Sequence, residues 1–236
     1  MPKKTQTQVS DLEIASLKES ALFSEKGKTK FSSRILVIGG SLTSEQLREI
    51  AKFASRYGDG TVHLTTRQGV EIPHIPYEKL PLFRKAIEKS SIKPAQSGKC
   101  VRAITACPGS YCKFGTIDTQ QLAKEIFKRF GNRKNLPHKF KIAVSGCRHC
   151  CSKPQENDLG VMGVGKFAMF VGGMAGKTPR WGDRLPFDIK EKSKLFNIIN
   201  AVITWYENNG NDKERFGVTI ERLGLTRLLD TLKMFQ

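Results

Sequence analysis

The six cysteines of this 236-residue chain are confined to one short central window. They occupy positions 100, 107, 112, 147, 150 and 151, and the remaining residues on either side contain none. Core cysteines placed at random are not expected to gather in this way, whereas the thiol ligands of one metal centre must meet in the fold. The fold is therefore expected to bring two cysteine-containing loops to one place.

Each cysteine loop follows a segment with the sequence of a strand. Val101–Ala106 leads into Cys107, and Lys139–Ser145 leads into Cys147. Strand ends placed side by side would bring both loops to one centre. Four thiolates at such a centre suit either tetrahedral zinc or a [4Fe–4S] cluster.

The spacing within each loop favours the cluster over zinc. Four residues separate Cys107 from Cys112, and three separate Cys147 from Cys151. Zinc ribbons prefer tighter knuckles with two intervening residues. Wider loops suit a larger object, and Pro108–Gly109 would allow the chain to wrap closely, because glycine tolerates unusual backbone angles.

Composition and charge indicate the class of protein, its location in the cell and the kind of partner it binds. With 39% hydrophobic and 26% charged residues, the chain is typical of globular proteins. It has no apolar run long enough to cross a bilayer and no apolar stretch typical of a secretory signal, so a cytoplasmic location is expected. Disulfides are rare there. The formal net charge of +18 predicts an anionic partner: nucleic acid, an acidic protein or a polyanionic cofactor.

The order of expected elements indicates an α+β protein. Residues 1–33 are polar and are expected to form an extension with one short helix near Asp11–Leu22. Residues 34–95 read β-α-β-α, as in a small α+β domain. Residues 96–236 carry the cysteine loops and end in two or three helices.

Local signals set the expected boundaries of several elements. Alternation of Val62 and Leu64 with polar neighbours predicts a strand beginning near residue 61. One helix is expected to begin at Thr43 or Ser44 and to end at Gly58, and a second to run from Leu80 to Lys89. A third is expected to begin at Asp118 or Thr119 and to end at Phe130. Gly210, Gly217 and Gly224 are expected to end the later helices.

Several motifs carry a family resemblance. ACPGSYCKFGTIDTQQLAKE, LPHKFKIAVSGCRHCC and DLGVMG, in that order, resemble the sirohaem and iron–sulfur domain of the sulfite and nitrite reductase family. LTTRQGVEI resembles a segment of the ferredoxin-like domain that precedes it, and GNDKERFGVTIERLGL resembles the closing helices. The resemblance covers roughly residues 35–232. It implies a small ferredoxin-like domain at 34–95, followed by an α/β sirohaem and iron–sulfur domain with C-terminal helices.

The resemblance implies two cofactors, sirohaem and a [4Fe–4S] cluster. The residues that match the cluster ligands are Cys107, Cys112, Cys147 and Cys151. Cys151 matches the ligand whose sulfur also bridges to the sirohaem iron. The first loop is one residue shorter than in the family, which has five residues between its cysteines. Cys100 and Cys150 are expected to be small buried residues, and His149 a loop residue.

The resemblance also implies a cationic pocket for a small oxyanion. Lys139 and Lys141 lie two apart on the expected strand, so they share one face, which by alternation alone fits a solvated surface. The family has a lysine pair and two arginines that reach the substrate, and the matching residues are Arg67, Arg102, Lys139 and Lys141. Expected partners for the sirohaem carboxylates are Gln68, Thr105, Ser110 and backbone groups near Gly172 and Gly173. Arg180–Arg184 would either add charge or form an exposed basic loop.

The implied activity is the six-electron reduction of a small oxyanion, sulfite to sulfide first and nitrite to ammonia second. IGGSLTSEQ lacks the G-x-G-x-x-G fingerprint of nucleotide binding. Electrons would therefore come from a separate protein, and the basic surface favours an acidic ferredoxin. Many family members fuse two copies of this unit, so a single copy predicts a homodimer or heteromer.

Three alternatives remain open at the level of sequence. They are a non-catalytic sirohaem and iron–sulfur electron-transfer protein, a basic zinc-containing nucleic-acid-binding protein, and a thiol redox protein. The second predicts zinc and strongly salt-dependent binding of nucleic acid. The third needs an exposed cysteine of low pKa with a resolving partner.

Overall fold

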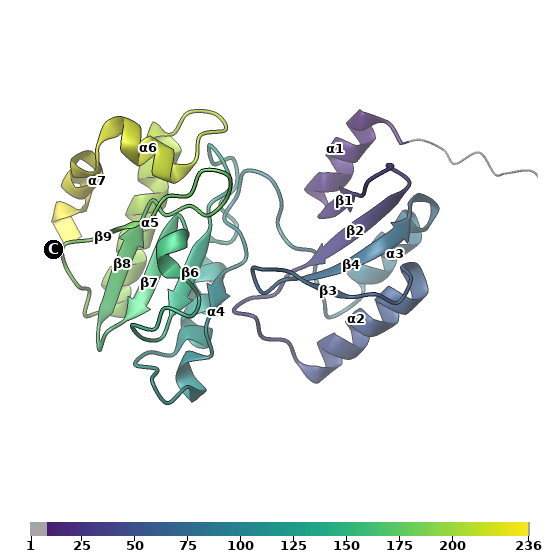
Figure 1. Cartoon of the computed structure of the whole chain (residues 1–236), viewed down its shortest axis with the longest axis horizontal. Helices are drawn as coiled ribbons and strands as arrows, with labels where there is room; N and C mark the ends of the chain where they lie inside the picture. Colours follow the sequence, from purple (N-terminus) through teal and green to yellow (C-terminus); the bar gives the residue numbers. More distant parts are fainter. Residues whose placement is uncertain (1–8, 236) are drawn as a thin grey trace, which may run out of the picture. The chain divides into compact units, whose positions relative to one another are not determined.

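The computed structural model describes residues 9–235, and these fall into two compact units that divide after Gly98. Each unit has a sheet of its own with helices packed beside it (Figure 1). The expected α+β class is confirmed.

The first unit is built on a four-stranded antiparallel sheet with strand order β1-β2-β4-β3. Its strands are β1 (Leu22–Ser24), β2 (Lys30–Ile35), β3 (His63–Leu64) and β4 (Val70–Pro76). Its helices are α1 (Asp11–Glu19), α2 (Ser44–Tyr57), η1 (Tyr77–Lys79) and α3 (Leu80–Glu88). Burial alternates along β2, as expected for a strand with one face on the core.

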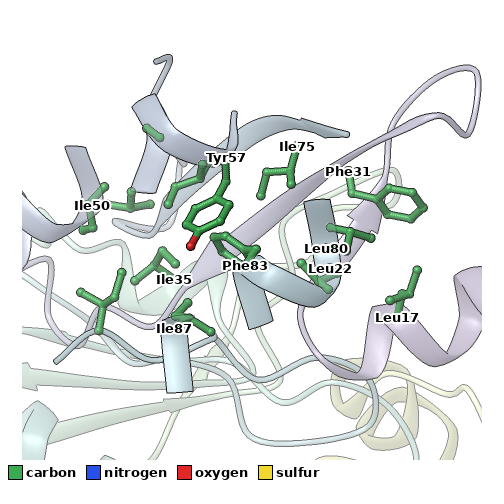
Figure 2. Packing of buried hydrophobic residues seen from close by; sticks show 14 of the residues in the cluster. Leu17, Leu22, Phe31, Ile35, Ile50, Tyr57, Ile75, Leu80, Phe83 and Ile87 are labelled. Carbon is green, nitrogen blue, oxygen red and sulfur yellow. The ribbon is translucent and has the colours of Figure 1, made fainter. Parts of the chain in front are cut away.

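The buried face of this sheet, α2 and α3 share one apolar cluster. Figure 2 shows Ile35 and Ile75 of the sheet beside Tyr57 of α2 and Phe83 of α3. The Tyr57 and Phe83 rings meet edge to face, with centroids 5.5 Å apart and an interplanar angle of 85°. Burial of these large rings gives the first unit a core that does not depend on a cofactor.

Residues 9–33 belong to this core and do not form a separate extension. Leu17 of α1, Leu22 of β1 and Phe31 of β2 are all buried in the cluster. The sequence of this segment did not predict its burial, because these three apolar residues are spaced among many lysines and serines. Residues 1–8 of the expected extension lie outside the described residues.

The helix limits read from capping residues agree with the structure. Thr43 caps α2 through a capping box: its Oγ1 accepts from Gln46 N at 3.1 Å, and Gln46 Oε1 accepts from Thr43 N at 3.0 Å. Gly58 ends this helix, and Asp118 caps the helix that follows the first cysteine loop.

The strand expected from residue 61 is instead a hairpin. β3 and β4 pair across a turn in which Thr65 N donates to Gly69 O at 2.8 Å, and Gln68 has a φ of +58°. Val62 and Leu64, whose alternation predicted the strand, are both exposed. The left-handed Gln68 followed by a glycine reverses the chain and ends the alternation.

The second unit is built on a five-stranded mixed sheet of order β5-β6-β7-β8-β9. β5, β6 and β7 are parallel, and β7, β8 and β9 are antiparallel. Its strands are β5 (Thr105–Ala106), β6 (Ile142–Ser145), β7 (Leu159–Gly163), β8 (Phe167–Val171) and β9 (Asp183–Arg184). Its helices are η2 (Gly109–Tyr111), α4 (Thr119–Phe130), η3 (Pro154–Glu156), α5 (Lys192–Asn209), α6 (Phe216–Leu223), α7 (Leu225–Leu232) and η4 (Lys233–Phe235).

An aromatic cluster joins the sheet side of this unit to the C-terminal helices. Phe140, Tyr206 and Phe216 are fully buried, and their ring centroids lie 5.3 to 5.7 Å apart. The Tyr206 hydroxyl donates to Glu214 O at 2.6 Å, which satisfies its only polar atom in the core. This cluster fixes the chain immediately before β6.

Gly217 differs from its expected role as a helix stop. It lies inside α6, whereas Gly210 and Gly224 do end helices. A Cβ at position 217 would lie 2.3 Å from the Gly172 carbonyl oxygen. Gly217 therefore permits close packing of α6 on the chain after β8. None of the described helices is both long and apolar enough to cross a membrane.

Candidate metal centre and its cationic surroundings

The two cysteine loops leave the second sheet at the same edge. β5 and β6 are parallel, with Ala106 opposite Val144. Cys107 follows β5 directly, and Cys147 follows β6 after one residue, Gly146. Because the carboxyl ends of parallel strands lie at one edge, the structure brings the loops to one place, as the sequence predicted.

The loops also contact each other through hydrogen bonds. The Gly146 N–H donates to Cys107 Sγ at 3.0 Å. The Gly146 carbonyl accepts from the backbone and the hydroxyl of Thr116, at 2.8 and 2.9 Å. These bonds join the Cys107 side chain and the residues after Cys112 to the second cysteine loop.

The first loop wraps tightly around its own backbone. The Cys107 carbonyl accepts from Thr119 Oγ1 at 2.5 Å and from Gln120 Nε2 at 3.0 Å, both at the start of α4. Gly109 has a φ of +46°, and a Cβ there would lie 2.1 Å from Thr119 Oγ1. Only glycine fits this position, which shows how a loop with four intervening residues closes without strain.

The second loop separates its two neighbouring cysteines. Cys150 has a φ of +53°, and its sulfur lies 3.3 Å from Met162 Sδ and accepts from Gln155 Nε2 at 3.1 Å. Cys151 is exposed. Cys150 is thus half-buried in contacts of its own, while Cys151 faces solvent at the position where a shared ligand is expected.

The four cysteines expected as cluster ligands differ in exposure. Cys107 is buried, Cys112 and Cys147 are half-buried, and Cys151 is exposed. They lie on the two loops that leave one sheet edge, and four thiols are the donor set that a [4Fe–4S] cluster takes.

Cys100 lies outside this group. It is buried and forms an isolated bridge with Lys134 rather than part of a loop. Burial raises the pKa of its thiol, against the opposing effect of Arg102 and Lys134. A buried thiol with a raised pKa is a poor nucleophile.

Three of the expected anion-binding residues flank a buried bridge of the second unit. Val101 and Phe140 form this parallel bridge, and Arg102 N donates to Phe140 O at 2.8 Å. Val101 and Phe140 are fully buried. Their neighbours Arg102, Lys139 and Lys141 are each half-buried.

A buried carboxylate holds the chain behind these cations. Asp158 is inaccessible to solvent, accepts from Lys141 N at 2.8 Å and forms an ion pair with Arg215 at 2.8 Å. Burial raises the pKa of Asp158, while Arg215 and the Lys141 N–H oppose that rise. Sequence reasoning missed Asp158 and Arg215, although both lie inside the motifs that carry the family resemblance.

His138 is a second residue that sequence reasoning missed. Its Nδ1 accepts from Lys139 N at 2.8 Å. Burial lowers the pKa of His138, and the nearby charges of Lys139, Arg215 and Arg102 lower it further. The imidazole is therefore neutral at pH 7. Its Nδ1 acts as the acceptor that holds the Lys139 backbone N–H in place.

The fourth expected cation, Arg67, belongs to the first unit. It lies with Gln68 in the tight turn between β3 and β4. Arg67 is half-buried, and Gln68 is exposed. The turn is held by Gln68 N donating to Thr65 O at 3.1 Å, which fixes the backbone that carries both residues.

The residues expected to bind the sirohaem carboxylates differ in their burial and in whether their hydrogen-bond donors are available. Thr105 is buried and its hydroxyl lies 3.4 Å from Ile142 O, whereas Ser110 is exposed. The Gly172 N–H already donates to Asp158 O at 2.8 Å and is not available to a carboxylate. A Cβ on Gly173 would lie 2.1 Å from Gln155 O, so this glycine serves close packing.

Within the Arg180–Arg184 segment, Arg180 is held by ion pairs, whereas Trp181 and Arg184 are exposed. Its guanidinium pairs with Asp183 at 2.6 Å and with Glu221 at 2.9 Å, and donates to Gly172 O at 2.9 Å. The side chain is only 16% exposed. Arg180 therefore ties β9 and α6 to the turn after β8.

Comparison with known proteins identifies the class to which this fold and these loops belong. Residues 97–234 match the nitrite and sulphite reductase 4Fe-4S domain, and residues 24–90 match the nitrite/sulfite reductase ferredoxin-like half domain. The chain belongs to the nitrite and sulfite reductase family. Domain matches and reductase relatives together imply a [4Fe–4S] cluster and sirohaem as cofactors.

Individual relatives give the scale of the similarity. The chain is 32% identical over 196 residues to the NAD(P)H nitrite reductase of Bacillus subtilis, covering 82% of this chain and 24% of that one. It is 35% identical over 157 residues to the ferredoxin–nitrite reductase of Synechococcus elongatus, covering 61% and 30%. The chain thus spans about a quarter to a third of the length of these curated relatives.

A solved structure shows the same fold. The Mycobacterium tuberculosis NirA protein superposes with a TM-score of 0.83 at 19% identity, over 96% of this chain and 47% of that one. The ferredoxin-like half domain, the iron–sulfur domain and the C-terminal helices expected from the sequence are therefore confirmed as the fold.

Proposed function

We propose that this protein reduces a small oxyanion by six electrons, converting sulfite to sulfide. The observation that carries the proposal is the meeting of the two cysteine loops at one sheet edge, joined by the hydrogen bond from Gly146 N to Cys107 Sγ. In this proposal Cys107, Cys112, Cys147 and Cys151 hold the [4Fe–4S] cluster. Cys151, the exposed member, would be the cluster ligand that also serves the sirohaem.

The cofactors supply the electron chemistry, in which sulfite takes six electrons and eight protons to give hydrogen sulfide and three waters. The protein binds and orients the anion. Arg102, Lys139 and Lys141, together with Arg67, are proposed to contact the oxyanion. The guanidinium groups would bind its oxygens in pairs, while the lysine ammonium groups deliver protons as oxygen leaves.

Fixed structure behind the cations supports this role. Asp158 and His138 each accept the backbone N–H of one of the two lysines. These bonds hold the backbone of both lysines in place.

Charge and shape favour sulfite over nitrite as the substrate. Sulfite has three oxygens and carries up to two negative charges near pH 7, whereas nitrite has two oxygens and one charge. The three cations proposed from the second unit would match the more highly charged anion better. Nitrite is the second candidate, because the relatives in Bacillus subtilis and Synechococcus elongatus are named nitrite reductases.

Sirohaem carboxylates are proposed to be bound by Gln68, Thr105, Ser110 and the backbone of Gly173. We propose that the electron donor is an acidic ferredoxin, because a chain of net charge +18 attracts an acidic protein, and one relative uses ferredoxin. We also propose a homodimer or a heteromer as the working form. Light scattering that finds a cofactor-loaded, active monomer contradicts this last proposal.

The test of the proposed function begins with protein purified without oxygen. We expect an absorption spectrum with a Soret band, together with iron and acid-labile sulfide. Reduced viologen should then support consumption of sulfite, measured beside nitrite at equal concentrations. A pale protein that stays without cluster and sirohaem after reconstitution contradicts the proposal. Bound zinc, together with a salt-dependent affinity for nucleic acid, would instead support the zinc-containing nucleic-acid-binding protein. The family membership does not favour that alternative.

A further inference from the structure

Every backbone N–H of the segment 138–141, which carries both lysines of the proposed anion pocket, has a hydrogen-bond partner. The Lys139 N–H donates to His138 Nδ1 at 2.8 Å, and the Lys141 N–H donates to Asp158 Oδ2 at 2.8 Å. The partners of the other two N–H groups are the Tyr206 hydroxyl and the Cys100 carbonyl. Three of the four partners are thus side chains that can gain or lose a proton.

His138 is the partner whose acceptor is lost when it titrates near neutral pH. Burial raises the pKa of the Tyr206 hydroxyl, so this group keeps its proton. Asp158 keeps an acceptor oxygen in either protonation state, and its pair with Arg215 favours the charged form. A histidine nitrogen that gains a proton becomes a donor and can no longer accept. The hold on Lys139 therefore depends on pH through His138.

The His138 ring lies among cations, which keep it neutral at pH 7. Burial lowers the pKa of His138 from its ordinary value of 6.5, and nearby positive charges lower it further. In decreasing order of effect, these charges are Lys139, Arg215, Arg102 and Lys99. Two of them are paired with carboxylates, Arg215 with Asp158 and Lys99 with Asp212. Because Nδ1 accepts from Lys139 N, the proton of the neutral ring lies on Nε2.

We propose that His138 is a positioning residue for Lys139, and that a proton on its Nδ1 releases this lysine in acid. The proposal rests on the proposed function, in which Lys139 contacts the oxyanion. A protonated Nδ1 would place a second donor against the Lys139 N–H, so the hydrogen bond is lost. The N–H of a half-buried residue then lacks its partner, which disfavours the held conformation. Phe140 is fully buried and bonded to Cys100 O at 2.9 Å, so the change stays local.

The test compares two substitutions at position 138 in the holoprotein. His138→Asn keeps an acceptor, because its Oδ1 takes the place of Nδ1, but the amide does not titrate. His138→Leu removes the acceptor at every pH. The measured quantity is kcat/KM for sulfite with reduced viologen at pH 7.5, 6.0 and 5.0. Each variant is divided by the parent at the same pH, which cancels the proton that sulfite itself gains over this range.

At pH 7.5 we expect His138→Leu to fall about tenfold below the parent, and His138→Asn to recover most of that loss. As the pH falls to 5.0, the ratio of His138→Asn to the parent should rise severalfold, because the parent alone loses its acceptor. His63→Asn, at an exposed histidine of β3, is the matched control and should keep a constant ratio. A constant ratio for His138→Asn, or parent-like activity of His138→Leu at every pH, overturns the proposal.

Amide hydrogen exchange of the same holoproteins gives a measurement that needs no turnover. Peptides that cover residues 136–142 should exchange faster in the parent than in His138→Asn at pH 5.0, and at equal rates at pH 7.5. Equal exchange at both pH values overturns the hold by His138, even when His138→Leu fails to fold. Absence of viologen turnover in the parent rejects the proposed function and leaves the exchange comparison intact.

Discussion

The backbone N–H of Lys141 donates to Oδ2 of Asp158 at 2.8 Å, which joins an expected anion-binding residue to a carboxylate with no exposure to solvent. Arg215 closes the arrangement by pairing with the same carboxylate, and its own side chain is 12% exposed. The charge of Asp158 therefore holds both Arg215, near the start of α6, and the segment that leads into β6.

We expect Asp158→Asn to destabilise the protein by about 3–5 kcal/mol, because it leaves Arg215 as an uncompensated buried charge. Urea unfolding at pH 7 measures the loss. Glu45→Gln is the control: it removes the exposed pair with Arg48, whose side chains are both about two-thirds exposed, and should cost less than about 1 kcal/mol. Equal losses in the two variants would show that the buried pair has no special role.

Lys141→Ala should lower kcat/KM for sulfite by about 100-fold, because the proposed pocket then lacks a cation where negative charge leaves with oxygen. Viologen-driven turnover measures this value, and an unchanged Soret band shows that the cofactors are retained. Lys124→Ala, on the exposed side of α4, is the matched control. Lys141→Arg should recover part of the binding but less of the rate, because arginine does not release its proton. Parent-like turnover in Lys141→Ala would remove this residue from the pocket.

Sequence predicted the features of this fold that depend on local rules. The capping box of Thr43 and Gln46, the stop at Gly58 and the helix after Asp118 each follow from hydrogen bonds within a few residues. The meeting of the cysteine loops was predictable for a similar reason. Two strands that each end at a cysteine need only lie parallel for their loops to share an edge.

What sequence could not predict depends on contacts between distant residues. Gly217 is a residue type that often ends helices. Its role in packing becomes clear only from its close approach to the Gly172 carbonyl. Arg180 looks like a free basic residue until Asp183 and Glu221 pair with it. Asp158 gave no signal as a charge partner, because Arg215 lies 57 positions away in the chain.

The proposed ligands can be separated from the other cysteines by single substitutions. Cys112→Ser should remove most of the iron and acid-labile sulfide, because oxygen is a poor replacement for a thiolate ligand of the cluster. Cys100→Ala should keep both, since this buried thiol lies on a bridge with Lys134. Iron and sulfide analysis of the two anaerobic proteins decides the matter. A cluster that survives in Cys112→Ser and is lost in Cys100→Ala would reverse the assignment.

The tight wrap of the first loop predicts the effect of a single methyl group. Gly109→Ala would place its Cβ 2.1 Å from Thr119 Oγ1, so the loop must move and the iron content should fall severalfold. Gly165→Ala separates steric overlap from backbone strain. Gly165 also has a positive φ, of +78°, but nothing lies within 4 Å of the added Cβ, and its cost should be only about 1 kcal/mol. Similar iron contents in the two variants would contradict the role of the wrap.

Glu214 should make the stability of the second unit depend on acid pH. The Arg222 side chain, helped by the Asn211 N–H, lowers the pKa of Glu214 from 4.5 to about 2. Because the folded pKa lies below the unfolded one, the stabilisation is complete above about pH 4.5 and is lost as the pH falls toward 2. Glu214→Gln should lower the free energy of unfolding by on the order of 2 kcal/mol at pH 7 and by much less at pH 3.

Urea unfolding of parent and variant at pH 7, 5 and 3 measures this difference, since titrations common to both proteins cancel. Glu221→Gln is the control, because its carboxylate is 57% exposed in its pair with Arg180. Its effect should stay below about 1 kcal/mol at every pH. A constant difference between Glu214→Gln and the parent from pH 7 to pH 3 would show that the Arg222 contact does not perturb the carboxyl, because a group with equal pKa values in both states contributes no pH dependence.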